Sequence, residues 1–290
     1  MQREFVVRFL QNHLINGTVP CDVRETEVEA VKFAVTCNKN DNRILEEQAR
    51  AWALQLQVPY VKRYDNGSLD AMLSDYHLDA LLIAGKKGPQ LYSREGMMLY
   101  HPGLGKVRWQ RVVQRNENDN FLTAMHLSPG QRVLDCTVGL AADALLASHA
   151  VGETGRVIGL EASLPLWFLT SRGVISYKSQ IPELVQDLQR IEIIHAEASA
   201  FLKTLPENSF DAVYFDPMFR QPVRKSSEMV PLRPLAFPEP LTLEMVELAL
   251  KAAPRVVIKE RSVEILQEYG CTEFVGSKYS AVRFGIRKRQ

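Results

Sequence analysis

Asp216, Pro217 and Phe219 come directly after residues 210–215, an apolar run that is typical of a buried strand. An exocyclic amine of a nucleobase is a poor nucleophile because its lone pair is delocalised into the ring, so a catalyst must accept hydrogen bonds from its N–H groups. The Asp216 carboxylate and the Pro217 carbonyl can be those acceptors, and Phe219 can stack on a flipped base for about 1–3 kcal/mol. These three catalytic candidates suit methyl transfer to such an amine, although an Asp-Pro pair can also simply begin a turn after a strand.

Two earlier strand-like runs, residues 132–136 and 156–161, also carry carboxylates at their ends. The first contains Asp135 and leads through a turn of small residues into a helix start, where backbone N–H groups can bind an anionic group such as a methionine carboxylate. The second ends in Glu161, about twenty residues beyond the glycine turn, where a carboxylate can accept from both hydroxyls of a ribose. Acids at strand ends also cap helices, which is the alternative explanation. The cofactor-binding candidates here are Asp135, Thr137, Gly139, Ala142, Asp143 and Glu161.

A third strand-like run, residues 191–195, is followed by Glu197 and Ala198. Glu197 or the adjacent backbone can meet the edge of an adenine ring, which makes both residues cofactor-binding candidates. An acid at a helix N-terminus explains Glu197 equally well. We expect His195 to be a packed or capping histidine, because amine methylation of this type needs no deprotonation before the attack.

Residues 86–115 contain seven Lys and Arg side chains against one acid, Glu95, with Tyr, His and Trp rings between them. Basic groups can neutralise phosphates and rings can stack on unpaired bases, so this segment is the best nucleic-acid-binding candidate in the chain. A solvated basic face is the alternative. Further basic residues lie in the long Pro-rich stretch up to Pro240, whose length favours a substrate clamp. The substrate-binding candidates are His101, Arg108, Arg220, Arg224 and Lys225.

Strands and helices alternate along the C-terminal part of the chain. Such alternation predicts an α/β fold with a Rossmann-like, mostly parallel sheet covered by helices on both faces. Residues 272–275 and 281–286 are strand-like and separated by a short loop. We therefore expect a C-terminal antiparallel hairpin, which adds an antiparallel edge strand as in class I methyltransferase sheets. The parallel strands are expected at residues 132–136, 156–161, 191–195, 210–215 and 254–259.

The N-terminal part predicts a smaller α/β domain. Strands are expected at residues 31–35, 60–63 and 80–84, and residues 43–56 carry helical periodicity. A polar break at residues 116–120 indicates the domain boundary. We expect an N-terminal domain, a candidate for RNA recognition, over residues 1–117 and a catalytic domain over residues 118–290.

Composition limits the classes of protein that fit. The formal net charge is +1 and the pI is near 7.7, so nucleic-acid contact must come from a local basic patch. The four cysteines are far apart and form no C-x-x-C pair, which points to a reducing compartment and away from a metal site. The start of the chain carries no apolar leader, and no apolar run is long enough to span a bilayer. We expect a cytoplasmic protein without metal or membrane, and the oligomeric state stays open.

The motifs Asp135-x-Thr137-x-Gly139-Leu140-x-x-Asp143, Glu161 and Asp216-Pro217-Met218-Phe219 resemble the RsmJ family. These are class I S-adenosylmethionine (SAM)-dependent methyltransferases that modify the N2 amine of a guanine in small-subunit ribosomal RNA. The similarity covers the C-terminal region and extends loosely into the N-terminal part. It implies SAM as the cofactor and a clamp role for Lys259 and for the region of Lys225 and Ser226. The cofactor contacts that it implies are Ala142-Asp143, Glu161-Ala162, Glu197-Ala198 and Asp216.

The chain departs from that family at three places. The family usually has Gly-Leu-Gly-Arg-Asp where this chain has residues 139–143, an Arg where Ala162 stands, and paired serines at positions 197–198. We expect a SAM-dependent N-methyltransferase acting on an exocyclic guanine amine in structured RNA, with the small ribosomal subunit as partner. Alternatives on the same scaffold are a methyltransferase for DNA adenine or a protein glutamine amide, and a non-catalytic RNA-binding protein. A nucleotide-dependent oxidoreductase fits less well, because the first βα turn lacks G-x-G-x-x-G.

Overall fold

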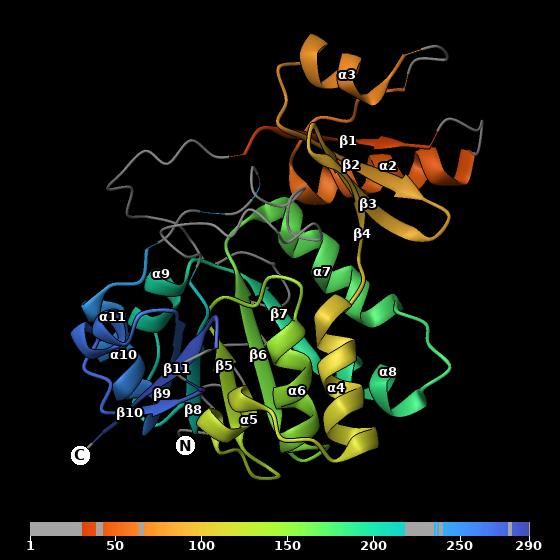
Figure 1. The fold of residues 1–290 in the computed structure, drawn as a ribbon. Coiled ribbons are helices and arrows are strands. Elements are labelled where there is room, and N and C mark those ends of the chain that lie inside the picture. The colour runs from red at the N-terminus through yellow and green to blue at the C-terminus, as the bar shows by residue number, and fades with distance from the viewer. Residues whose placement is uncertain are drawn as a thin grey trace.

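The computed structural model describes residues 31–38, 43–63, 67–217, 235, 237, 240–277 and 280–289. They form two β-sheets, a four-stranded sheet followed along the chain by a seven-stranded sheet. Figure 1 shows the smaller sheet above the larger one, with helix α7 (Leu164–Ser176) between them. Within the described residues, no helix is both long enough and apolar enough to cross a membrane.

The smaller sheet has the strand order β1-β2-β3-β4. Strands β1 and β2 are parallel, whereas β3 pairs antiparallel with both β2 and β4. Helix α2 packs Trp52 against one face of the sheet, and α3 packs Met72 against the other. The elements are β1 (Phe33–Cys37), α2 (Arg43–Leu56), α3 (Leu69–Asp75), β2 (Ala80–Gly85), β3 (Gly88–Ser93) and β4 (Gly96–Leu99).

The structure confirms the expected small α/β unit and the bounds of α2. The prediction of a strand at residues 60–63 is wrong. In this segment the structure has only a single isolated β-bridge, between Tyr60 and Val35. The preceding Pro59 has no N–H for a longer ladder. Strands β3 and β4 were not predicted. They lie within residues 86–115, the basic segment predicted from the sequence as a nucleic-acid-binding candidate. Their turn residues and mixed polarity hide the alternation of buried and half-buried side chains in β3.

The larger sheet has the strand order β10-β11-β9-β8-β5-β6-β7. Strands β5 to β9 are parallel, as expected, and β11 runs antiparallel to β9. The predicted C-terminal hairpin is confirmed, but its antiparallel strand β11 is not at the edge, because β10 pairs with the outer side of β11. The strands are β5 (Arg132–Asp135), β6 (Arg156–Glu161), β7 (Ile191–His195), β8 (Ala212–Phe215), β9 (Arg255–Glu260), β10 (Glu273–Val275) and β11 (Arg283–Lys288).

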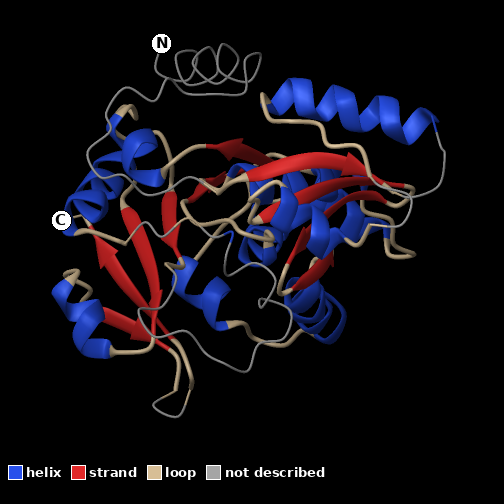
Figure 2. Cartoon of the chain, turned by 90° about the horizontal axis from the view of Figure 1, so that it is seen from above, coloured by secondary structure: helices blue, strands red, loops and turns tan. Residues whose placement is uncertain are grey.

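Helices cover both faces of the larger sheet, as Figure 2 shows from above. Val133 and Val257 face a layer formed by α5, α6 and α8, whereas Leu134 and Ile258 face a layer formed by α9, α10 and α11. Because both faces are buried, the strands are continuous apolar runs. The remaining helices are α4 (Gly103–Arg115), α5 (Asn120–Met125), α6 (Ala142–Val151), α8 (Pro182–Gln189), α9 (Ala198–Lys203), α10 (Leu243–Ala252) and α11 (Val263–Glu268).

Helix α4 packs with the larger sheet. Trp109 is 1% exposed and shares a core cluster with Phe121 and Val133. Its ring Nε1 donates to Asp187 Oδ2 of α8 at 2.6 Å. A domain boundary after residue 117 would separate α4 from these partners, and we propose instead a boundary at residues 100–102, after the smaller sheet ends.

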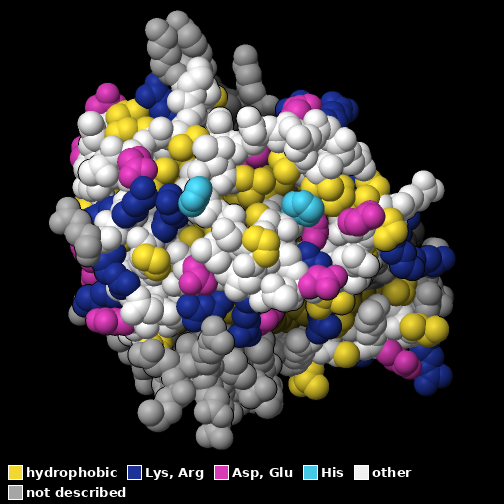
Figure 3. All heavy atoms as spheres, turned by 90° about the horizontal axis from the view of Figure 1, so that it is seen from below, with side chains coloured by type: hydrophobic (Ala, Val, Ile, Leu, Met, Phe, Trp, Pro, Cys, Tyr) yellow, Lys and Arg dark blue, Asp and Glu magenta, His cyan; other side chains and the backbone are white. Residues whose placement is uncertain are grey.

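The face of the molecule seen from below carries Lys and Arg side chains interspersed with Asp and Glu (Figure 3). Charges of opposite sign that lie side by side cancel part of each other's field. The other end of the larger sheet carries the carboxyl ends of the parallel strands. In α/β folds, binding sites usually lie at these carboxyl ends.

Candidate functional site

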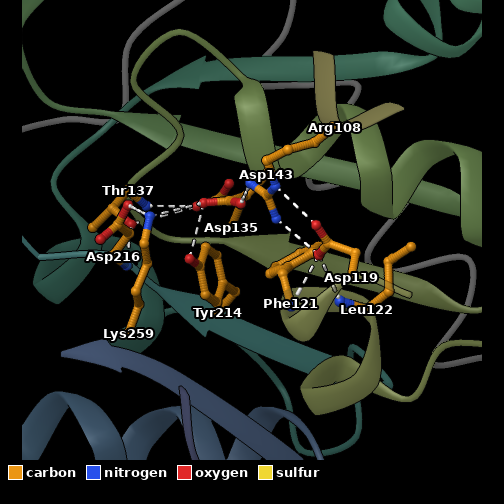
Figure 4. Close-up of polar contacts among 10 residues, drawn as sticks. All are labelled: Arg108, Asp119, Phe121, Leu122, Asp135, Thr137, Asp143, Tyr214, Asp216 and Lys259. Carbon is orange, nitrogen blue, oxygen red and sulfur yellow. Dashed lines mark hydrogen bonds and ion pairs between the residues drawn. The ribbon is translucent and has the colours of Figure 1, made fainter. Parts of the chain in front are cut away.

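Three neighbouring strands of the larger sheet, β5, β8 and β9, bring their carboxyl ends together. Asp135 ends β5, Asp216 follows β8, and Lys259 lies near the end of β9. Two residues earlier, each strand contributes a side chain to the core cluster under α5 and α6. Side chains two residues apart on a strand point to the same face, so these three polar groups meet on that face (Figure 4).

Thr137 joins the ends of β5 and β8. Its backbone N–H donates to Asp135 Oδ1 at 3.0 Å, and its hydroxyl accepts from the backbone N–H of Asp216 at 2.6 Å. The turn after β5 is thereby held against the Asp-Pro pair. A group bound at one of these strand ends therefore lies next to a group bound at the other.

Asp143, in the first turn of α6, is the centre of a chain of charges. Its Oδ2 accepts from the Tyr214 hydroxyl at 2.9 Å and lies 3.5 Å from Lys259 Nζ. Lys259 also donates to Asp216 Oδ2 at 2.6 Å. On the other side, Arg108 Nη1 donates to Asp143 Oδ1 at 2.5 Å. Figure 4 shows this chain running from the end of β8 to α4.

Arg108 also makes a two-pronged contact with Asp119. The guanidinium Nε and Nη2 donate to different oxygens of Asp119, each at 2.9 Å. Asp119 is the N-cap of α5 and accepts from the backbone N–H groups of Phe121 and Leu122. Arg108 is therefore held on both sides, with 25% of its side chain exposed, and it connects α4, α5 and α6.

The ionisation of these groups follows from burial and neighbouring charges. Burial raises the pKa of Asp135 to about 8, and the carboxylates of Asp143 and Asp216 act in the same direction. Burial also raises the pKa of Asp216 to about 6, although Lys259 opposes this rise. Burial also tends to raise the pKa of Asp143, but the positive charges of Lys259 and Arg108 outweigh burial and hold this pKa below its ordinary value. At neutral pH the site therefore holds ionised Asp143 and Asp216 beside a mostly protonated Asp135.

Glu161 ends β6, beside the turn that follows β5. It is 9% exposed and accepts from the backbone N–H of Ser163 at 2.8 Å. Burial raises its pKa to about 7, against the opposite effect of backbone hydrogen bonds. The turn approaches β6 closely, since Val138 N–H donates to the Leu160 carbonyl at 3.0 Å. A Cβ at Gly159 would come within 2.4 Å of Val138, so only glycine permits this approach.

The turn before α6 uses left-handed backbone conformations. Gly139 has φ +51°, and Ala141, the N-cap of α6, has φ +61°. Alanine has no side-chain oxygen with which to cap a helix, and the described part of the chain shows no side-chain cap at this position, so the first N–H groups of α6 can donate to another acceptor. Thr170 of α7 donates to the Gly139 carbonyl at 2.9 Å and fixes the turn. A helix start of this kind can bind an anionic group.

The other predicted cofactor residues lie around the end of β7. The carbonyl oxygen of Ala162 lies 3.0 Å from His195 Nε2, and the His195 ring lies 5.6 Å from that of Trp167. Burial lowers the pKa of His195, which agrees with the expectation of a packed histidine. Glu197 is the N-cap residue of α9, and Ala198 is the buried first residue of that helix.

The predicted substrate-binding residues that the structure describes are His101, Arg108 and Lys259, and the last two meet at Asp143. His101 is exposed before α4, where its Nδ1 accepts from the backbone N–H of Gly103 at 2.9 Å. Arg108 and Lys259 are engaged by carboxylates inside the protein. The catalytic candidate Phe219 and the basic residues Arg220, Arg224 and Lys225 lie outside the described residues.

Sequence reasoning missed two members of the site, Tyr214 and Asp119. Tyr214 lies two residues before Asp216, so strand alternation alone places it on the same face. Asp119 directly precedes α5, a position where Asp commonly caps a helix. Neither signal indicates that the Tyr214 hydroxyl turns to Asp143 or that Asp119 receives Arg108.

Comparisons with known proteins agree with this geometry. Residues 96–286 match a family described as "Putative SAM-dependent methyltransferase". The uncharacterised protein YpiP of Bacillus subtilis is 36% identical over 211 residues, covering 72% of this chain and 81% of YpiP. The ribosomal RNA small subunit methyltransferase J of Acinetobacter baumannii is 31% identical over 207 residues, covering 66% of this chain and 72% of that protein. A solved SAM-dependent methyltransferase from Neisseria gonorrhoeae shares the fold with a TM-score of 0.56 at 16% identity, over 88% of this chain and 95% of that chain.

Proposed function

This chain belongs to the family of SAM-dependent methyltransferases, and on that premise we propose that it methylates an exocyclic guanine amine of small-subunit ribosomal RNA. The enzyme class and the cofactor follow from the family. The observation that carries the choice of acceptor is the position of the Asp216-Pro217 pair, which is held by Thr137 against the turn after β5. The name of the relative in Acinetobacter baumannii supports small-subunit ribosomal RNA as the substrate.

The groups at the carboxyl ends of β5 and β6 are suited to bind the ribose and the methionine carboxylate of SAM. In this proposal the carboxylate of Glu161 accepts from the ribose hydroxyls, and the first N–H groups of α6 bind the methionine carboxylate. The side chain of Val138 packs directly on Gly159 and so holds the turn after β5 against β6. Ser163 Oγ is buried beside Glu161 and has no hydrogen-bond partner within the part of the chain that the structure describes.

The charges of the site suit a cationic cofactor. With Asp135 protonated, the charges that meet around Asp143 are three carboxylates and two cations, so one negative charge is left over, and the partly ionised Glu161 adds to it. A sulfonium carries one positive charge, and the product thioether carries none, so this excess favours the methyl donor over the product. The groups counted are Asp119, Asp143 and Asp216 against Arg108 and Lys259.

SAM supplies an electrophilic methyl group on its sulfonium. Asp216 and the Pro217 carbonyl accept hydrogen bonds from the acceptor amine and so favour the pyramidal nitrogen that attacks. A carboxylate has about four acceptor sites, so Asp216 can hold Lys259 and the amine together. As the N–C bond forms and the C–S bond breaks, the nitrogen gains positive charge and must lose a proton. With a pKa of about 6, Asp216 is ionised at neutral pH and can accept that proton.

Mass spectrometry of nucleosides from small-subunit ribosomal RNA tests the proposal. RNA from cells that lack the protein should lose one N2-methylguanosine, and purified protein with SAM should restore it. A parallel assay compares intact small subunits, free ribosomal RNA, double-stranded DNA and protein. An unchanged set of modified guanosines in the deletion strain, with no methyl transfer to small subunits or their RNA, would refute the proposal.

The same acceptor chemistry also fits two other substrates, DNA adenine and a protein glutamine amide. Both present a planar nitrogen whose lone pair is delocalised, so Asp216 and Pro217 would act in the same way. Methyl transfer to DNA or to protein in the parallel assay, without transfer to RNA, would select one of them.

A further inference from the structure

Lys259 and Arg108 were predicted to contact the substrate, but their charges face inward. Lys259 Nζ lies 2.6 Å from Asp216 Oδ2 and 3.5 Å from Asp143 Oδ2, with 20% of the side chain exposed. Arg108 Nη1 lies 2.5 Å from the other oxygen of Asp143. A buried cation requires paired, hydrogen-bonded partners. A phosphate of RNA would have to compete with these carboxylates, so the contacts support another role.

We infer that Lys259 and Arg108 are positioning residues that, joined through Asp143, hold the Asp216 carboxylate ready for the acceptor nitrogen. The inference rests on the proposed function, which assigns Asp216 to the acceptor. Charges alternate from Asp119 through Arg108, Asp143 and Lys259 to Asp216, so each group has neighbours of opposite sign.

The packing of α4 sets the position of Arg108. Gly105, about one turn earlier, touches α6 so closely that a Cβ there would lie 2.8 Å from Ala142 Cα. The next residue, Trp109, is buried and donates to Asp187 Oδ2 at 2.6 Å. This packing fixes the backbone of Arg108 against α6, within reach of its carboxylate partner there.

The charge state of Asp216 depends on neighbours from several elements. The carboxylate of Asp143 favours its protonated form, whereas Lys259 and Arg108 favour the ionised form, and Asp135 is protonated over the range in which Asp216 titrates. The Tyr214 hydroxyl donates to Asp143, and burial raises the pKa of Tyr214, so it stays neutral. Within the described residues, the titratable and charged groups facing Asp216 are Asp135 on β5, Asp143 on α6, Tyr214 on β8, Lys259 on β9 and Arg108 on α4.

Removal of either cation should change the protonation of Asp216. An adjacent opposite charge lowers the pKa of a carboxyl by about 1–3 units. In Lys259→Met the midpoint of Asp216 should therefore rise from about 6 by about 1–3 units. Arg108→Met should raise it by a smaller amount, because Arg108 lies one group further away in the chain. Lys259→Arg keeps the charge and should restore most of the wild-type midpoint.

Carbon-13 NMR of the Asp216 carboxyl measures these midpoints in the purified full chain and needs no RNA. The signal is assigned by its loss in Asp216→Asn. The matched control is Lys251→Met, which removes an exposed lysine of α10 and should leave the midpoint unchanged. Circular dichroism shows whether each variant folds. If Lys259→Met does not fold, Arg108→Met carries the same test.

Coinciding midpoints of Asp216 in the wild type, Arg108→Met and Lys259→Met would overturn the inference. The second readout is the pH profile of kcat at saturating SAM with small-subunit RNA. Its acidic limb should move in Lys259→Met by the same amount as the NMR midpoint, with KM for RNA within about twofold of the wild type. A raised KM with an unchanged kcat profile would make Lys259 a substrate-binding residue and also overturn the inference. A wild type that methylates no RNA would refute the proposed function alone, because the NMR midpoints test the positioning independently.

Discussion

Replacement of Glu161 by Gln is expected to weaken SAM binding and to flatten its dependence on pH. Burial raises the pKa of Glu161 to about 7, so the carboxylate is about one-tenth ionised at about pH 6 and about nine-tenths ionised at about pH 8. Ribose hydroxyls donate to the ionised form, so the wild-type affinity should rise about ninefold over this range, or about 1.3 kcal/mol. A hydrogen bond to a charged acceptor contributes about 1.5–3 kcal/mol. At about pH 8 the variant should therefore bind about 10–150-fold more weakly than the wild type.

Isothermal titration calorimetry of SAM into the purified protein measures both effects. Asp135, with a pKa of about 8, and Asp216, with a pKa of about 6, titrate in neighbouring ranges, so the slope that remains in Glu161→Gln belongs to these two residues. Parallel series with Asp135→Asn and with Asp216→Asn separate the three carboxylates. If the wild-type dissociation constant stays level between about pH 6 and about pH 8, or if Glu161→Gln keeps the full slope and affinity, the assignment of the ribose to Glu161 is wrong.

Two further changes test other parts of the site, and a stability measurement gives a second test of Glu161→Gln. Asp216→Ala should lower kcat by at least about 100-fold while the SAM dissociation constant changes about tenfold at most; near-normal single-turnover transfer to small-subunit RNA would contradict the mechanism. Gly105→Ala should lower the free energy of unfolding by about 1–3 kcal/mol, since its Cβ would lie 2.8 Å from Ala142 Cα. Urea unfolding measures this change. In the exposed control Leu104→Ala, the free energy of unfolding should stay within about 0.5 kcal/mol of the wild type. Without SAM, the folded wild type binds the Glu161 proton more tightly than the unfolded chain, so it loses stability as pH rises from the ordinary 4.5 to about 7. Glu161→Gln should therefore be the more stable protein at about pH 8 by about 1–3 kcal/mol, and equal stabilities there would speak against a raised pKa.

Local sequence patterns were sufficient to predict the strands at whose ends the acidic residues lie. A strand buried on both faces is a continuous apolar run, and the turn or helix after it begins where the run ends. The positions of Asp135, Glu161 and Asp216 could therefore be predicted, and so could the helix start at α6. The same patterns indicated the alternation of strands and helices in the C-terminal part of the chain and the C-terminal hairpin. They could not show that β10 lies outside β11, because pairing at a sheet edge depends on which strand remains unpaired after folding.

The roles of the charged side chains depend on contacts between segments that are distant along the chain. Tyr214 and Asp143 are 71 residues apart, and Lys259 and Asp216 are 43 residues apart. Arg108 looked like part of a basic surface, since its sequence neighbours are basic. The packing of α4 on α6 instead turns its guanidinium to Asp143. A side chain's charge is readable from its residue type, but its partner is selected by strand order and helix packing, which no local pattern encodes.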